Sequence, residues 1–182
     1  VPEDAVAIQL DGDVSLSVRL IDCVGYMING ASGRYENGEE RMVSTPWFDH
    51  EVSITQAAET GTQTEISDHS TIGLVITTDG SVCGIERSEY VDAEKRVIEE
   101  LQFIGKPFVV LINSTDPNSD SAKELKNNIE STYSVTAMCV NCQELNEEQI
   151  TEILQNVLME FPVTQLGFNL PSWLSALPFE TK

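Results

Sequence analysis

A chain of 182 residues, 41% of them apolar, is long enough to form one domain with a substantial core. None of its apolar runs approaches the length of about 20 residues that spans a membrane, so we expect no direct membrane insertion. The formal net charge is −20, from 30 acidic and 10 basic side chains, and this excess argues against a general basic surface for nucleic acid. We therefore expect no nucleic-acid partner.

Four cysteines indicate the redox environment. Cys139 and Cys142 form a C-x-x-C pair, but no second cysteine pair and no nearby histidine completes a zinc site. A thioredoxin-type redox pair needs a helix that begins at its first cysteine, whereas Asn146 is the predicted helix start here. Reduced, partly buried thiols of the cytosolic kind fit the pattern better, so the expected location is cytoplasmic.

The chain begins with two predicted antiparallel strands, residues 5–10 and 15–26, joined by the turn Asp11-Gly12-Asp13. The second strand ends in Asp22-Cys23-Val24-Gly25, a D-x-x-G sequence. In P-loop NTPases such an aspartate holds the water shell of Mg²⁺, and the glycine amide approaches the last phosphate. Asp22 is therefore the candidate metal ligand, and Asp22 and Gly25 are the candidate catalytic residues. As an isolated tetrapeptide the motif is weak, and a polar strand end that turns into a loop explains it better.

Residues 27–51 form a long segment rich in glycine, asparagine and charge. Connections of this length in compact domains are usually functional or mobile. After a D-x-x-G strand, this is where a nucleotide-sensing loop would lie. A surface loop held down by Trp47 and Phe48 is the simpler reading, and the two readings are compatible.

From Ser53 onward, helices and strands alternate. The predicted elements are a helix capped by Ser53 and Gln56, a strand over 71–78, a helix from Ser88 to a Gly105 cap, a strand over 107–113, a helix capped by Ser121 and Glu124, a strand over 135–140, and a helix from Asn146 to Phe161-Pro162. This order predicts right-handed crossovers and an α/β fold, in which a mostly parallel sheet lies between helices on both faces.

Ligands of such folds bind at the carboxyl ends of the strands. Besides the D-x-x-G sequence, Thr77-Thr78-Asp79 and Asn113-Ser114-Thr115-Asp116 occupy predicted strand ends. The latter has the outline of N-K-x-D, in which the asparagine supports the phosphate loop and the aspartate reads a guanine edge. Asn113 and Asp116 are therefore candidate nucleotide-binding residues. Ser114 replaces the lysine of that motif, which counts against guanine, and Asp116-Pro117 is also a typical turn.

Longer stretches carry a family resemblance. The sequence resembles the stage IV sporulation protein A family, the morphogenetic ATPases of the spore coat, in RLIDCVGY, STPWF, DHSTIGLVITTDG (68–80), RSEYVDAEKRVIEELQFIGKPF (87–108) and FPVTQLGFNLPSW. The resemblance implies a GTPase-like P-loop NTPase fold that uses ATP and Mg²⁺ in the intact parent protein. By motif, Asp22 and Gly25 transfer to the catalytic site, and Asn113 and Asp116 to the base side. It also implies an ATPase domain over 1–162 and the start of a connection to the next domain over 163–182.

The resemblance implies a biological role as well. In the family, ATP hydrolysis drives self-assembly into a layer on the outer forespore membrane, on its mother-cell side. The implied partners are other copies of the protein, spore coat proteins and a small membrane-anchoring peptide, the last two through the parent protein.

One departure from the family is important: no G-x-x-x-x-G-K-[ST] occurs in the sequence. We expect the phosphate loop and the strand before it to lie upstream of Val1, so the fold is predicted to lack both. Without a lysine and backbone amides around the phosphates, this piece is predicted to bind ATP weakly and to be inactive alone. The D-x-x-G strand and residues 71–78 would then pair directly or borrow an edge from a second molecule.

Two other functions remain open. The N-S-T-D outline of residues 113–116 favours a GTPase of another lineage. A fold that has lost its chemistry would instead be a non-enzymatic scaffold or interaction module. Arg87, Lys95 and Arg96 could stabilise a transition state, but side chains on a helix start and face are more often solvated ion pairs.

Overall fold

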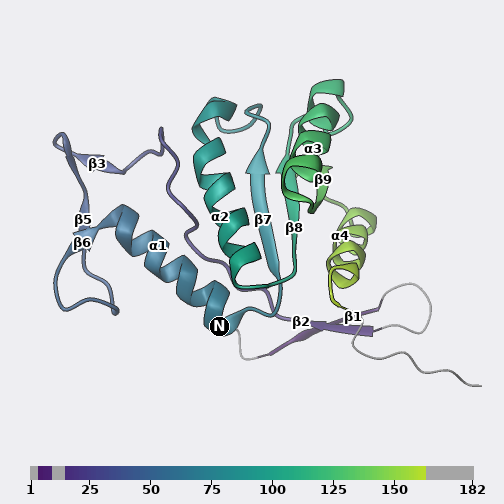
Figure 1. The fold of residues 1–182 in the computed structure, drawn as a ribbon, viewed down its shortest axis with the longest axis horizontal. Helices are drawn as coiled ribbons and strands as arrows, with labels where there is room; N and C mark the ends of the chain where they lie inside the picture. The colour runs from purple at the N-terminus through teal and green to yellow at the C-terminus, as the bar shows by residue number, and fades with distance from the viewer. Residues whose placement is uncertain (1–3, 10–14, 163–182) are drawn as a thin grey trace, which may run out of the picture.

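The computed structural model describes residues 4–9 and 15–162, and Figure 1 shows their arrangement. The predicted connection over 163–182 lies outside the described residues. The elements are β1 (Val6–Gln9), β2 (Ser15–Val18), β3 (Tyr35–Glu36), β4 (Glu39–Glu40), β5 (Met42–Val43), β6 (Val52–Ser53), α1 (Ile54–Thr64), β7 (Gly73–Thr78), α2 (Val91–Phe103), β8 (Phe108–Asn113), α3 (Asp120–Tyr133), β9 (Thr136–Val140) and α4 (Glu147–Met159). A π-helical turn, Glu65–His69, extends α1, and a 3₁₀ turn, Arg87–Glu89, precedes α2.

The centre of the molecule is a parallel sheet of three strands in the order β7-β8-β9. Val75 pairs with Val110, and Val110 with Ala137, so the three strands run in register side by side. Each connection between them is a helix, as the alternating sequence pattern predicts. The α/β class and the parallel sheet between helices are therefore confirmed.

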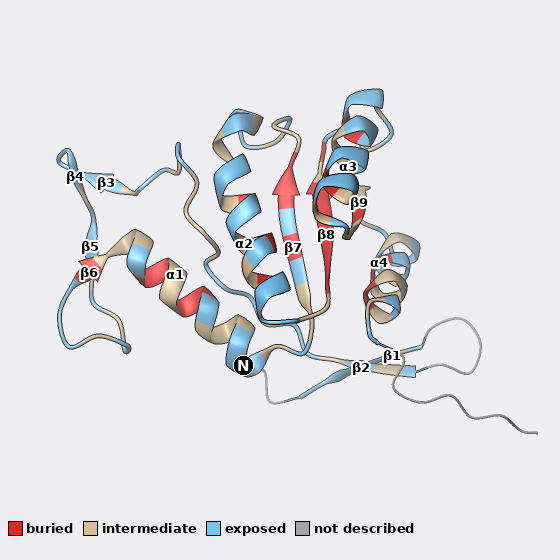
Figure 2. Ribbon diagram, in the orientation of Figure 1, coloured by how far each residue is buried: buried red, intermediate tan, exposed pale blue. Residues whose placement is uncertain are grey.

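Two apolar clusters attach the helices to opposite faces of the sheet. On one face, Ile98 and Leu101 of α2 and Ile129 of α3 pack against β7, β8 and β9. On the other face, Ile153 and Val157 of α4 pack against Val109, Leu111 and Val140. β8 is buried along most of its length because it has a strand on each side and helices on both faces, as Figure 2 shows.

The helix boundaries follow local capping chemistry. The Ser53 hydroxyl accepts a hydrogen bond from the Gln56 amide at 3.2 Å, and Asn146 and Gln149 form a reciprocal capping box, so both predicted starts are confirmed. Gly105 has a φ of +69°, which suits its position just after α2. The predicted start of α3 is wrong by two residues: Ser119, which is extended, caps the Ala122 amide in place of Ser121. α2 begins at Val91 rather than Ser88, because the preceding residues form the 3₁₀ turn.

The second predicted strand is much shorter than expected. β1 and β2 pair antiparallel, as predicted, but β2 ends at Val18. Leu20 and Val24, which the prediction placed in the strand, are each 76% exposed. Within the described residues, β2 pairs only with β1 and the parallel sheet ends at β7. The expected direct pairing of the D-x-x-G strand with residues 71–78 is therefore wrong: β2 does not close up against β7. Figure 1 shows the β1–β2 hairpin at the end of the molecule opposite the carboxyl end of β7.

The predicted irregular segment contains the antiparallel pair β3–β4 and the strand β5, which pairs with β6 just after the segment. Trp47 lies over α1: a Cβ built on Gly61 would come within 2.9 Å of the Trp47 ring. This contact bears out the prediction that Trp47 pins the segment to the domain. Among the described residues, no helix combines the length and apolar character needed to cross a membrane.

Candidate functional site

The carboxyl ends of β7 and β8 meet at one rim of the sheet, where polar side chains join them. The Asp79 carboxylate accepts hydrogen bonds from the Ser81 amide at 2.9 Å and the Ser81 hydroxyl at 2.5 Å. The Ser81 hydroxyl oxygen in turn accepts a hydrogen bond from the Thr115 amide at 2.9 Å. Ser114, which is buried, also bonds the Asp79 side chain. The two loops of the rim are therefore held together by one polar network.

The charge of Asp79 is stabilised within this network. Partial burial acts to raise its pKa, but hydrogen bonds from Ser114 and Ser81 outweigh burial and hold the pKa below its usual value. The carboxylate is therefore ionised at neutral pH. Its position at the end of β7 matches the strand-end aspartate that the sequence pattern singles out.

The two candidate base-side residues lie at the end of β8. The Asn113 side-chain oxygen accepts a hydrogen bond from the Cys142 amide at 3.0 Å, which ties β8 to the loop after β9. Asp116 is exposed, and its carboxylate accepts a hydrogen bond from the Asn118 amide at 3.3 Å. This bond forms an Asx turn just before α3, so the turn predicted at Asp116-Pro117 is present. Both side chains have local structural roles.

The D-x-x-G residues lie in the irregular segment after β2, away from this network. Asp22 is exposed, and no described residue forms a hydrogen bond or ion pair with it. The Gly25 amide donates a hydrogen bond to the Thr62 hydroxyl of α1 at 3.0 Å, and Gly25 has a φ of +80°. Further along the segment, Gly30 approaches the loop after β7: an added Cβ there would lie 3.6 Å from a methyl group of Ile85. The structure thus joins the β7 and β8 ends and leaves Asp22 outside that hydrogen-bonded group.

A partly buried ion pair supports the loop after β7. Arg87 contacts Glu94 of α2 at 2.7 Å and the Thr77 hydroxyl at 3.4 Å. The Glu94 side chain is only 3% exposed, and its second carboxylate oxygen has no partner among the described residues. The expectation of a solvated pair is therefore wrong for Arg87. The signal was in the sequence, because Glu94 shares its helical face with Ile98 and Leu101.

The two basic residues of α2, Lys95 and Arg96, lie nearer the surface than Arg87. Lys95 approaches Glu99 at 3.8 Å with both side chains more than half exposed, as expected for a solvated pair. Arg96 binds both carboxylate oxygens of Glu59 in α1 and lies 5.0 Å from the centre of the Tyr26 ring. Arg96 thereby links α1, α2 and the segment after β2.

The rim supplies oxygen ligands and amides but few groups that would hold phosphates. Asp79, Asp116 and the neighbouring hydroxyls suit a hydrated cation or a sugar and base. Triphosphate needs positive charge, and Arg87, which follows the rim loop, is committed to Glu94. No cluster of three His, Cys, Asp or Glu side chains suited to a metal occurs within the described part of the chain. The described rim residues therefore offer oxygen atoms and amides to a ligand, but little positive charge for phosphates.

Comparison with known proteins identifies the family. Residues 1–162 match the family described as "Stage IV sporulation protein A, ATPase domain". The chain belongs to this family. It is 46% identical to stage IV sporulation protein A of Clostridioides difficile (strain 630) over 97% of its own length. The proteins of the same name from Bacillus anthracis and Bacillus subtilis (strain 168) are 40% and 39% identical over the same share.

The chain spans 36% of the length of each of these relatives. No solved structure matches it. The resemblance inferred from RLIDCVGY and the longer stretches is confirmed, and with it the assignment to sporulation proteins and to their ATPase domain.

Proposed function

We propose that the chain is part of an ATPase domain whose hydrolysis of ATP drives self-assembly of a spore morphogenetic protein on the outer forespore membrane. The observation that carries this proposal is the match of residues 1–162 to the ATPase domain of the family. The parallel sheet, with polar residues at the carboxyl ends of its strands, is the architecture in which nucleotides bind. The protein acts in the cytoplasm, on the mother-cell side of that membrane.

ATP and Mg²⁺ are the proposed cofactors of the intact protein. Asp22, which is exposed and has no bonding partner in the described part of the chain, supplies the carboxylate for the hydrated Mg²⁺, and Gly25 the amide near the last phosphate. Asn113 and Asp116 border the base. Bound Mg²⁺ would neutralise charge on the phosphates, while these residues position the nucleotide.

The 182 residues contain no G-x-x-x-x-G-K-[ST], so this piece by itself binds ATP weakly and does not hydrolyse it. Isothermal titration of the 182-residue chain with ATP and Mg²⁺ tests this directly. Heat that fits a micromolar dissociation constant would contradict it. Adding the family's upstream segment should restore binding.

Asp22 is the residue to test in the full-length protein. Replacing Asp22 with Ala should lower ATP turnover about 100-fold, the size of one lost electrostatic contact to a transition state. Asp49→Ala is the matched control, because Asp49 is an equally exposed aspartate in the same N-terminal region. Unchanged turnover in Asp22→Ala would remove Asp22 from the mechanism.

The base preference needs a separate measurement. Ser114 stands where a guanine site has lysine, and Asn113 has its side-chain oxygen committed to Cys142. We therefore expect the full-length protein to hydrolyse ATP faster than GTP. The reverse order would support a GTPase of another lineage.

A non-enzymatic scaffold is the second candidate. The structural roles of Asp79, Asn113 and Arg87 favour it, because these rim residues are already satisfied within the chain. Assembly of full-length protein can be followed by light scattering with ATP and with a non-hydrolysable analogue. Equal assembly under both conditions would favour the scaffold.

The proposed partners are other copies of the protein, spore coat proteins and a small membrane-anchoring peptide. The last two bind through the rest of the parent protein. Binding of coat proteins or the anchoring peptide to the 182-residue chain alone would contradict this division.

A further inference from the structure

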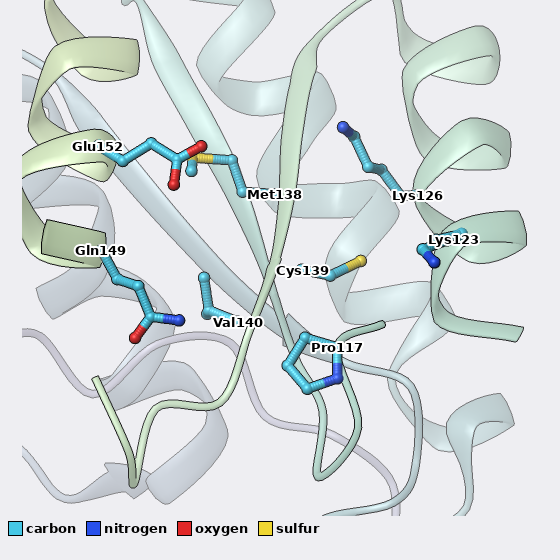
Figure 3. A pocket seen from close by; sticks show the side chains of 8 residues that line it. All are labelled: Pro117, Lys123, Lys126, Met138, Cys139, Val140, Gln149 and Glu152. Carbon is cyan, nitrogen blue, oxygen red and sulfur yellow. The ribbon is translucent and has the colours of Figure 1, made fainter. Parts of the chain in front are cut away.

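A groove follows the outer edge of β9, at the side of the sheet away from β7. Figure 3 shows Lys123 and Lys126 of α3 on one side of the strand and Gln149 and Glu152 of α4 on the other. The cavity between them has a volume of about 230 Å³. β9 is the last strand of the described sheet, so its outer edge borders this groove.

The backbone of β9 presents hydrogen-bonding groups to the groove. In a parallel ladder, successive residues direct their amide and carbonyl to opposite sides of the strand. The Val140 carbonyl accepts a hydrogen bond from the Ser114 amide at 2.9 Å, so Val140 faces β8. Ala137 and Cys139 consequently face outward. The Ala137 amide donates a hydrogen bond to the Glu130 carboxylate at 3.1 Å, and Ala137 is buried. Cys139, which lines the groove, therefore directs its backbone amide and carbonyl into it.

The two walls of the groove carry opposite charge. Lys126 lies 3.7 Å from Glu130, a loose pair with both side chains more than a third exposed. Lys123 has no carboxylate within 4.0 Å among the described residues. Across the strand, Glu152 provides a carboxylate and Gln149 an amide. A strand added to β9 would alternate its side chains between these walls.

We propose that the β9 edge binds an extended segment of another protein, in which acidic side chains facing Lys123 and Lys126 alternate with basic or amide side chains facing Glu152 and Gln149. The backbone of the segment pairs with Cys139, and the alternating charges set its register. Such a segment is nearly neutral, so the net charge of −20 repels it little.

A second copy of the chain fits the edge poorly. Two β9 strands paired antiparallel about a two-fold axis would place α3 beside α3 and α4 beside α4, and hence lysine near lysine and Glu152 near Glu152. Like charges in contact oppose such a pairing, and the net charge of each copy adds to the repulsion.

The test uses two blocked, fluorescein-labelled peptides of about eight residues, a length typical of strands. One alternates Glu and Lys, and the other has the same composition with all Glu before all Lys. Fluorescence polarisation with the 182-residue chain should show binding of the alternating peptide about tenfold tighter than of the block peptide. Hydrogen exchange should show protection of the Cys139 amide only with the alternating peptide.

Variants separate the groove from general charge effects. Lys123→Glu with Lys126→Glu should weaken binding of the alternating peptide about tenfold, and the milder pair Lys123→Gln with Lys126→Gln serves if the first misfolds. Lys95→Glu is the matched control, an exposed lysine of α2 outside the groove, and should leave binding unchanged.

Three outcomes would overturn the proposal. The first is equal affinity for the two peptides, which includes the case in which neither binds. The second is binding of the alternating peptide that the Lys123 and Lys126 substitutions leave unchanged. The third is a Cys139 amide that the bound peptide does not protect from exchange. Concentration-dependent self-association of the chain that the lysine substitutions abolish would overturn the choice of partner and assign the edge to a second copy.

Discussion

Two stretches of the chain are rich in apolar residues, but one is buried in the core and the other is largely exposed to solvent. Residues 108–113, which form β8, are almost completely buried, with Val109, Val110 and Ile112 at 0% exposure. Residues 19–26 are also mostly apolar but have no regular structure, and Leu20 and Val24 are mostly exposed. The difference lies in the neighbours: β8 has a strand on each side and helices on both faces, whereas the segment after β2 has neither.

The contrast extends to the two halves of the chain. From Gly73 onward, helices and strands alternate, and most of the buried apolar residues lie there. Before Gly73, only Val52, Ala57 and Ala58 belong to the described buried apolar set. The first half is held to the second by the contacts of Arg96, by polar contacts of Gln63 and Lys106, and by Ile66, which packs against the core on the α2 side of the sheet. It follows that the two halves should respond differently to substitution.

The largest difference in stability should appear when a leucine is replaced by alanine in each of the two stretches. Leu111→Ala deletes a side chain that is 2% exposed, and it should lower the free energy of unfolding by about 2–5 kcal/mol. Leu20→Ala should change it by no more than about 0.5 kcal/mol, because Leu20 is already in water. Urea unfolding measures both. Equal losses would mean that Leu20 is buried against something outside the described residues.

The next largest loss of stability should come from breaking the ion pair between Arg87 and Glu94. Arg87→Ala leaves the buried Glu94 carboxylate without a counter-charge, which should cost about 3 kcal/mol. Replacing Glu94 by Gln as well should recover part of that loss, because the buried charge is then gone. Lys95→Ala is the control within the same helix, and its exposed pair with Glu99 should be worth about 0.5 kcal/mol or less.

Arg96→Ala should loosen the contact between the two halves. It removes the pair with Glu59 and the stacking on Tyr26, together worth about 1 kcal/mol. Hydrogen exchange should show faster exchange of α1 amides and unchanged exchange of β8 amides. Acceleration of both would show that the halves unfold as one unit. Arg96→Lys, which keeps the charge but not the bidentate geometry, should give an intermediate result.

Weakening the hydrogen-bond network around Asp79 should lower stability by a smaller amount that depends on pH. The pKa of Asp79 is lower in the folded than in the unfolded chain, so its contribution is present above the unfolded value and is lost as pH falls through the folded value. Ser81→Ala removes the hydroxyl bond to this carboxylate and keeps the backbone amide bond, and it should reduce stability near neutral pH more than in acid. Thermal unfolding across the acidic range, with Ser131→Ala as a control, measures the difference. A loss independent of pH would mean that the charge of Asp79 is not involved.

The smallest effect should come from Gly61→Ala in α1. Alanine favours helix, but its Cβ would meet the far end of the Trp47 side chain, which can move. Stability should change by about 1 kcal/mol or less, while Trp47 becomes more exposed. In a Trp173→Phe background, its emission should shift to longer wavelength. Unshifted emission would mean that Trp47 does not rest on Gly61.

Much of the second half was predictable because its signals are local. Continuous β-branched runs predict buried strands, and caps such as Asn146 predict helix starts, since both depend on nearby residues in the sequence. The position of Glu94 was readable in the same way, from its spacing to Ile98 and Leu101. Misplaced boundaries, such as Ser119 for Ser121, arose where two serines two residues apart could each cap the helix.

The candidate site was harder to predict because it depends on contacts between distant residues. Sequence spacing placed Asp79, Asn113 and Asp116 at strand ends, and the structure shows how Ser81 and Ser114 join two of these ends. Asp22 and Gly25 stay predictions as catalytic residues. Nothing in RLIDCVGY itself shows that the strand stops at Val18, because strand length depends on the presence of a neighbour.

The sequence by itself determined the family, the α/β class and the alternation of buried strands with capped helices, because periodicity and capping act over a few residues. Tertiary structure alone decided which apolar stretches became strands, that Arg87 is held by a buried carboxylate, and that a charged groove lies beside β9. Those outcomes depend on which distant segments come together, since burial and strand pairing are properties of neighbours in space.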